Sequence, residues 1–277
     1  MAAARNAATT CGVDIRDLIE LPDLQRVYEL YEQIWRPDPA NPPITTEFLR
    51  ALSHSGNYVA GAYLGNDLVG ACTGFFASPA GRALHSHVAG VASGLRGKNV
   101  GFALKTHQRA WALERGISVI TWTFDPLVCR NAYFNVAKLG ARPRTYLPDF
   151  YGKMHDSING DGESDRLLME WLLTDETVDR ACQGHTVPAD AAALRAAGAG
   201  VALDSDSQGL PVIADTQATT ILVRVPRDIE GLRLSAGQCA GRWRVALRQV
   251  LGSLLEGGAT VTGFDRSGWY VLQRPGA

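Results

Sequence analysis

A glycine-containing loop with two basic residues is the part of the sequence whose residue types point most directly to a chemistry. The loop Arg96-Gly97-Lys98-Asn99-Val100-Gly101 follows an apolar, strand-like segment and precedes a helical one. Backbone N–H groups at a helix start have no partner within the helix and lie at the positive end of its dipole. The two glycines allow close approach of an anion, and Arg96 and Lys98 add positive charge. The pattern indicates a phosphate site, although a glycine turn with solvated basic residues would look the same.

Two histidines precede this loop at a spacing that suits proton transfer. His85 and His87 lie two residues apart in a predicted strand, so they are expected on one face together with Ala89 and Val91. Histidine has an ordinary pKa of about 6.5 and can take a proton from an attacking amine near neutral pH. The alternative is one buried structural imidazole and one exposed imidazole.

Hydrophobic periodicity and turn residues place helices and strands in alternation around these residues. The pattern predicts helices at 21–35, 102–115, 131–139 and 243–255, and a short helix after Thr45 and Thr46. Strands are predicted at 58–64, 68–76, 84–91, 118–124, 166–173 and 220–225, with two more short ones ending at Leu272. This alternation is typical of an α/β protein.

The composition excludes several classes of protein. The 277 residues are 46% hydrophobic and 20% charged with a net charge of -1, so nothing indicates nucleic-acid or membrane binding. No apolar run approaches the roughly 20 residues of a membrane span, and the N-terminus lacks the apolar core of a secretion signal. The five cysteines stand singly, which indicates neither a metal site nor a disulfide framework. We therefore expect a cytoplasmic protein without a metal.

Segments on both sides of the loop resemble a known family. Val88-Ala89-Gly90-Val91 is similar to the end of the central strand that leads into the R-x-x-G-x-G loop of the GCN5-related N-acetyltransferase (GNAT) superfamily. The segment 102–115 resembles its cofactor helix, and Lys138-Leu139-Gly140-Ala141 resembles its K-L-G-F helix end. Order and spacing agree over residues 13–175. The segments 121–127 and 131–135 look like a little-characterised branch of predicted acyltransferases.

This resemblance implies a fold and a domain organisation. The fold would be α/β: a mixed, mostly antiparallel central sheet with a splayed parallel pair, flanked by helices, plus a small C-terminal α/β extension. We expect the acyl-CoA-binding domain at 13–175 and a β-α-β extension at 216–277. The segment 176–215, rich in Ala, Gly, Asp and Ser, is predicted to be a linker or crossing segment.

The resemblance also implies roles for individual residues. The splayed opening would admit the acyl-pantetheine arm, and the Val91 N–H would donate to the thioester carbonyl. Asn131, at a helix start, would bind the pantetheine. His85 and His87 are similar to the paired histidines of arylalkylamine N-acetyltransferases, and His85 also lies where other members have a catalytic glutamate. The loop residues implied to bind the pyrophosphate are Arg96, Gly97, Lys98, Asn99, Val100 and Gly101.

Two positions depart from the family pattern. Asn99 stands where the loop has its first glycine, so a left-handed backbone there must be reached by asparagine. Val136 stands where many members have the tyrosine that protonates the leaving thiolate. Tyr146 is a candidate replacement, although an ordinary half-buried loop tyrosine fits its position too. Asp125 is expected either to anchor an amine or, as the simpler interpretation, to cap the following helix.

The expected function is transfer of an acetyl or longer acyl group from coenzyme A to the amine of a small molecule or amino acid, by direct attack on the thioester. The alternatives are O-acyl transfer, use of an acyl carrier protein, and a non-catalytic acyl-CoA sensor. Lys105 and Arg109 are expected to join the basic cluster near the phosphates, and His107 is expected on a solvated face. The polar loop with His155 is a weak candidate for the acceptor pocket, and a homodimer is compatible with the sequence.

Overall fold

The computed structural model describes residues 1–37, 42–152, 162–186 and 188–276. They form two compact units. The first comprises Met1–Trp122 and Trp171–Gln183, and the second comprises the remainder of the described chain.

The first unit is a mixed sheet with helices. Strands β1 (Asp14–Asp17), β2 (Tyr58–Leu64), β3 (Asp67–Ala77) and β4 (Ala83–Val91) are antiparallel neighbours in chain order, and β5 (Val119–Phe124) begins parallel to β4. The helices are α1 (Ala2–Cys11), α2 (Leu21–Trp35), α3 (Thr46–His54), α4 (Val100–Glu114) and α6 (Glu176–Cys182), with a 3-10 turn η1 (Ser93–Leu95). This confirms the predicted α/β class with one splayed parallel pair.

The helices begin where the sequence predicts them for local reasons. Pro22 lies in the first turn of α2, where its missing N–H costs nothing. Thr45 caps α3, its hydroxyl accepting the Phe48 N–H at 3.2 Å. The face of α2 that carries Leu24 and Val27 is fully buried, so packing fixes this helix against the sheet.

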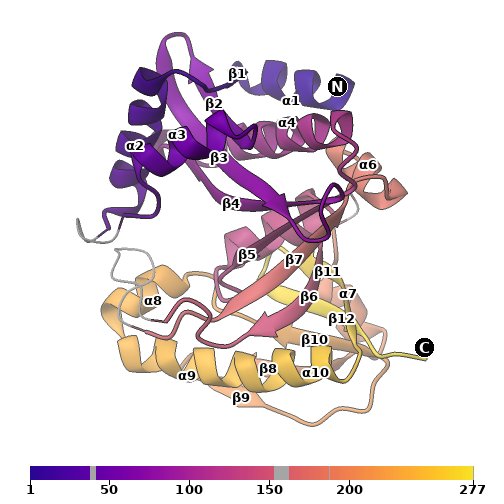
Figure 1. Ribbon diagram of the computed structural model, residues 1–277. Coiled ribbons are helices and arrows are strands. Elements are labelled where there is room, and N and C mark those ends of the chain that lie inside the picture. Colours follow the sequence, from indigo (N-terminus) through magenta and orange to yellow (C-terminus); the bar gives the residue numbers. More distant parts are fainter. Residues whose placement is uncertain (38–41, 153–161, 187, 277) are drawn as a thin grey trace. The chain divides into compact units, whose positions relative to one another are not determined.

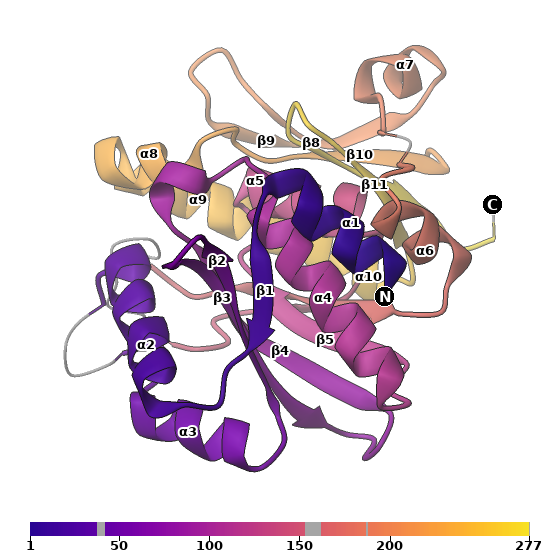
Figure 2. The same cartoon turned by 90° about the horizontal axis from the view of Figure 1, so that it is seen from above.

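Helices cover both faces of the first sheet. A Cβ on Gly70 would meet Val100 and Leu104 of α4, whereas a Cβ on Gly90 would meet Trp35 of α2 at 2.7 Å. The absence of a side chain at Gly90 therefore lets the end of α2 lie against β4. The N-terminal helix α1 runs along α4 (Figure 2).

The second unit has a sheet of its own. Strand β6 (Arg142–Leu147) pairs antiparallel with β7 (Arg166–Leu172), and both belong to the seven-stranded sheet of order β1-β2-β3-β4-β5-β7-β6. The further sheet has the order β11 (Thr260–Asp265), β12 (Trp269–Gln273), β10 (Thr220–Arg224), β8 (Gly200–Ser205), β9 (Pro211–Ile213), with β10 and β8 parallel. The helical elements are α5 (Cys129–Ala132), the π-helical turn η2 (Tyr133–Lys138), α7 (Ala191–Ala196), α8 (Ile229–Ser235), and the continuous run α9 (Gly237–Leu247), η3 (Arg248–Gly252), α10 (Ser253–Glu256) (Figure 1).

The division of the chain differs from the predicted one. The segment 176–215 contains α6, α7, β8 and β9 instead of a linker. Asp175 and Asp190 cap the two helices through their carboxylates, and Leu203 is fully buried. Such short helices and strands need few large apolar residues, so the low content of large apolar residues in this segment did not reveal them. Residues 216–277 contain β10, then helical elements, then β11 and β12.

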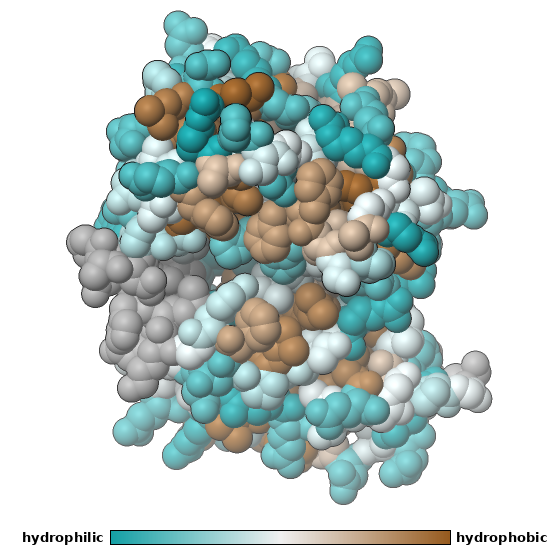
Figure 3. Space-filling model, in the orientation of Figure 1, coloured by the Kyte–Doolittle hydropathy of each residue, from teal (hydrophilic) through white to brown (hydrophobic). Residues whose placement is uncertain are grey.

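Large apolar side chains also occur on the surface. Phe48 and Phe76 are exposed in the first unit, and Leu234 and Val245 in the second. On the face shown in Figure 3, apolar residues form patches between hydrophilic ones. Within the described ranges, no helix has both the length and the apolar character that crossing a membrane requires.

Candidate functional site

The first unit contains an opening between its two parallel strands. The ladder joins Ala83 to Val119 and continues to His85 opposite Thr121, where it ends. Beyond His85, β4 runs on to Val91, and this ladder does not continue with it. His85 therefore lies at the point where β4 and β5 part.

A β-bulge lies in β4 directly at this point. Val88 is opposite Thr73 of β3, but Ser86 is opposite Gly74, so His87 is the extra residue. A bulge breaks the alternation of side chains and increases the local twist. Its position explains why β4 turns away from β5 after His85.

The bulge corrects one expectation from the sequence. Val91 is opposite Gly70, whose Cβ direction faces α4, whereas His85 is opposite Phe75, five residues further along the unbroken strand β3. Five is an odd number, so His85 and Val91 lie on opposite faces of the sheet. The prediction that Ala89 and Val91 share a face with the histidines was wrong, because period-2 counting does not hold across a bulge.

The two histidines themselves lie together. Their ring centroids are 6.3 Å apart, and both rings contact Phe75, at 5.2 Å for His85 and 5.7 Å for His87. His85 Nδ1 is 3.2 Å from the Thr121 hydroxyl, which links it to β5. The histidine pair thus occupies one face of β4 beside the opening.

The surroundings of both imidazoles favour the neutral form of the ring. Burial, followed by the neighbouring His87 and then Lys105, lowers the pKa of His85 to about 4. Loss of surrounding water lowers the pKa of His87. Neutral imidazole is the form that accepts a proton, so the pair can act as base at neutral pH.

The Val91 backbone N–H points into the opening. The Ala92 N–H donates to the Val69 carbonyl oxygen at 2.9 Å, which makes these two residues a hydrogen-bonded pair. Hydrogen-bonded and non-hydrogen-bonded pairs alternate in an antiparallel ladder, so the adjoining Val91 directs its N–H away from β3. That is the side on which β5 leaves β4, as the oxyanion role requires.

The loop between β4 and α4 has the backbone predicted for it. Gly97 has φ 81° and Asn99 has φ 64°, both in the left-handed region. Asn99 therefore adopts the conformation that glycine has in the family pattern, which asparagine tolerates better than most residues. The N–H groups of Arg96 and Lys98 bond to Ser93 and Leu95 within the turn.

The helix start beyond the loop can hold phosphate. The first helical bond of α4 is from the Ala103 N–H to the Asn99 carbonyl oxygen, so Val100 and Gly101 lie in the turn whose N–H groups point out of the helix. Arg96 and Lys98 are exposed beside it, and no acidic residue occurs from Val91 to Leu113. The donors and the positive charge fit the pyrophosphate of coenzyme A.

The two other predicted site residues belong to the second unit. Asn131 lies in α5 and is half-buried. Tyr146 in β6 is buried, and its hydroxyl donates to Asp165 Oδ2 at 2.7 Å. Burial and the adjacent Asp165 raise the pKa of Tyr146 far above its ordinary value. This environment is that of a structural tyrosine.

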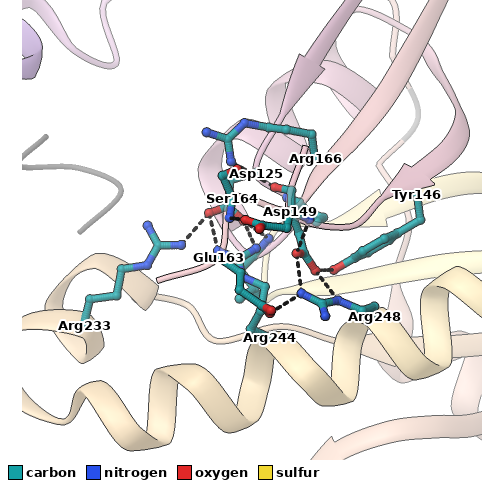
Figure 4. Close-up of polar contacts among 12 residues, drawn as sticks. Asp125, Tyr146, Asp149, Glu163, Ser164, Arg166, Arg233, Arg244 and Arg248 are labelled. Carbon is teal, nitrogen blue, oxygen red and sulfur yellow. Dashed lines mark hydrogen bonds and ion pairs between the residues drawn. The ribbon is translucent and has the colours of Figure 1, made fainter. Parts of the chain in front are cut away.

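Asp125 and Asp165 each anchor arginines in the second unit (Figure 4). Asp125 is buried and accepts two hydrogen bonds from Arg244 at 2.7 Å each, and a further bond from Arg233. Asp165 accepts from Arg248 at 2.6 and 2.9 Å. The Asp125 carboxylate also accepts the Leu127 N–H at 3.0 Å, so the predicted capping function is present. The pairing of Asp125 with Arg233 and Arg244, which follow it by more than 100 residues, was not predicted from the sequence.

Removing the Asp125 carboxylate is expected to destabilise the second unit strongly. Burial raises the pKa of this carboxyl, but Arg244 and Arg233 outweigh it and bring the pKa below its ordinary value. Asp125→Ala would remove the carboxylate that pairs with the largely buried Arg244 guanidinium, at a cost of about 3–5 kcal/mol. Urea unfolding of the full chain measures this change, and Asp215→Ala, an exposed aspartate, should lie within about 0.5 kcal/mol of the wild type.

The sign of the pH dependence follows. Because the folded-state pKa of Asp125 is depressed, its contribution is present above the unfolded pKa of about 3.9 and is lost as the pH falls below that value. Wild-type stability should therefore fall more steeply on acidification than that of Asp125→Ala. Equal slopes would contradict the assignment.

Lys105 and Arg109 do not join the phosphate cluster. Lys105 is buried against the sheet, where its Nζ contacts Ser86. Arg109 donates to the Leu173 carbonyl oxygen and to Asp179. His107 is half-buried, with Nδ1 2.9 Å from the Tyr58 hydroxyl, so its predicted solvated position was wrong. A helical wheel alone could not show this, because α1 also covers α4.

His155 lies outside the described residues. Among the described ones, no three histidine, cysteine or acidic side chains are grouped so that they could hold a metal ion.

The opening between β4 and β5 and the helix start of α4 lie in an α/β domain with a mixed sheet. Residues 24–133 match the family model of the acetyltransferase (GNAT) family. The chain therefore carries a GNAT acetyltransferase domain.

Solved structures with a similar fold include several acetyltransferases. The ribosomal-protein-S18-alanine N-acetyltransferase of Escherichia coli is 15% identical, with a TM-score of 0.47 over 59% of this chain and 95% of that one. Ard1 from Thermoplasma volcanium is 15% identical, with a TM-score of 0.46 over 59% and 99%. The yncA protein of Salmonella typhimurium, solved with its cofactor acetyl-CoA, is 16% identical, with a TM-score of 0.46 over 65% and 98%. No curated protein matches the sequence.

Proposed function

We propose that this protein transfers an acyl group from acyl-coenzyme A to the amine of a small molecule or amino acid. The observation that supports the proposal is the end of the β4–β5 ladder at His85, because the histidine pair lies beside it and β4 continues from it to Val91. The family match over residues 24–133 supports it independently. Because the matching family is one of acetyltransferases, acetyl-CoA is the simplest donor to propose.

The loop and helix start would bind the donor. Gly97, Val100 and Gly101 offer backbone to the pyrophosphate, and Arg96 and Lys98 neutralise its charge. A Cβ at Gly97 would meet nothing within 4 Å, so the backbone there is accessible to a ligand. The expected role of Asn131 in binding the pantetheine stays a prediction from the family resemblance.

The chemistry proposed for the opening is direct attack. An imidazole of the His85–His87 pair takes the proton from the amine, whose nitrogen then attacks the thioester carbonyl carbon. The carbonyl oxygen gains negative charge and is held by the Val91 N–H. The C–S bond breaks as the nitrogen loses its second proton, and that proton is transferred to the thiolate, so that free coenzyme A thiol and the amide are formed. Because the Tyr146 hydroxyl already donates to Asp165, we assign Tyr146 a structural role.

Coenzyme A binding is the first test. Acetyl-CoA and coenzyme A should raise the melting temperature of the full chain, because a ligand that binds only the folded state stabilises it by about 2.7 kcal/mol at 100 times its Kd. NAD and ATP are the controls and should have little effect. Absence of any shift with coenzyme A would contradict the proposal.

Turnover is the second test. Release of free thiol from acetyl-CoA, measured with pools of amines and amino acids, separates an enzyme from a sensor. Binding without thiol release in any pool would favour the sensor.

A further inference from the structure

A buried lysine lies beside the proposed opening. The Lys105 side chain, from the cofactor helix α4, is almost fully buried. Its Nζ donates to the Ser86 hydroxyl at 3.0 Å and to Gln108 Oε1 at 2.8 Å. Burying an ammonium is costly unless it is paired, so this placement needs an explanation.

Aromatic rings take the place of a counter-ion. The ammonium lies 3.9 Å from the Trp122 ring centroid and 5.6 Å from that of Trp171. No ion pair found among the described residues includes Lys105. Cation–π contacts of a desolvated ammonium offset part of the burial cost.

The lysine connects the strands that carry the proposed chemistry. Ser86 is the residue of β4 between the two histidines, and Trp122 follows Thr121, the β5 partner of His85. Lys105 thus bonds to β4 on the face opposite His85 and contacts β5 at Trp122, the first residue beyond the last paired position of the two strands.

We propose that Lys105 is a positioning residue for the acyl transfer: its buried cation, which bonds to Ser86 of β4 and lies over the Trp122 ring of β5, holds the two strands in place where the opening begins. This rests on the proposed function in one respect, the role of His85 as base. The effect of its charge on His85 requires neither donor nor acceptor.

The charged surroundings of His85 are few. Its own strand contributes His87, β3 contributes the uncharged Phe75, β5 contributes the uncharged Thr121, and α4 contributes Lys105. Burial lowers the pKa of Lys105 to about 8, so the ammonium is charged throughout the acidic range in which His85 titrates. A positive charge nearby favours the neutral imidazole.

The direction in which the pKa of His85 should change when Lys105 is replaced follows from these charges. Lys105→Met removes the charge and keeps the side-chain length, so the pKa of His85 should rise, by about 0.3 pH units or more. With a raised pKa, His85 becomes protonated at a higher pH as the solution is acidified, and the protonated ring cannot act as a base. The acidic limb of kcat/KM should move upward by a similar amount, which a merely structural change in Tm or kcat would not produce.

The decisive measurement is an NMR titration of the His85 ring in full-length, histidine-labelled protein, with and without Lys105→Met. Ser86→Ala, which removes the hydrogen bond and keeps the charge, should leave the His85 titration within about 0.2 pH units. Arg180→Met, which removes an exposed cation from α6, controls for net charge and should also have little effect. If Lys105→Met does not fold, Lys105→Gln takes its place.

One measurement needs no variant. The Cε carbon of Lys105 in wild-type protein should titrate near pH 8, and an amine that is already neutral between pH 4 and 7 would overturn the proposal. So would an unchanged His85 titration in folded Lys105→Met. Because these titrations require neither acyl-CoA nor acceptor, they stay interpretable if the proposed function itself fails; that failure would appear instead as no thiol release.

Discussion

Gly101→Val is expected to weaken acyl-CoA binding by about 100-fold or more, because the added side chain would stand at the helix start that binds the pyrophosphate. Gly101 lies in the first turn of α4 and is not among the glycines with a left-handed backbone, so valine can adopt its conformation. Each charge-assisted hydrogen bond contributes about 1.5–3 kcal/mol, and losing two corresponds to a factor of about 100 or more.

The measurement is the Kd of coenzyme A by calorimetry, with circular dichroism to show that the fold persists. Gly241→Val is the matched control: it also introduces valine at a helical glycine, in α9, and its Cβ would meet nothing within 4 Å. That variant should bind coenzyme A like the wild type. An unchanged Kd for Gly101→Val would refute the assignment of the loop.

Removing both imidazoles, by His85→Ala and His87→Ala together, should lower kcat/KM by about 100- to 10,000-fold at neutral pH, which is the usual contribution of a general base. Coenzyme A binding should remain, since the phosphate site is formed by the loop and α4. The rate should recover as the pH approaches the pKa of the amine, where the acceptor arrives already deprotonated.

The single variants show which ring acts. His85 lies within hydrogen-bond distance of Thr121 where the strands part, whereas His87 is the bulge residue, so unequal losses of rate would identify the base. His54→Ala, at the exposed end of α3, is the control and should keep the full rate. Retention of the wild-type rate by the double variant would exclude the pair as base.

Local patterns predicted the elements of the site well. The helix α2 has the predicted bounds, and the strand–loop–helix unit around 96–101 lies where its residues indicate. Asn99 adopts the left-handed backbone that the comparison with a glycine pattern required. These features depend on neighbouring residues, so a sequence carries their signal.

The features that sequence did not show depend on distant partners. The bulge at His87 is a property of the pairing of β4 with β3, and nothing in the residues of β4 alone marks it. Lys105 looks like a surface residue of an amphipathic helix until Trp122 and Trp171 are placed against it. The sequence contained only a weak indication of this burial: a basic residue in a helix that is followed by strands rich in aromatic residues.

The division into units has a consequence for how the protein is made. The first unit includes Trp171–Gln183, so it is incomplete until those residues have been synthesised. Asp125 and Asp165 are translated long before Arg244 and Arg248, the arginines that neutralise them. We expect a nascent chain arrested after residue 183 to expose carboxylates that lack their arginines. Such a chain would need its C-terminal third before chaperones release it. Shortened versions that end near residue 183 would meet the same difficulty.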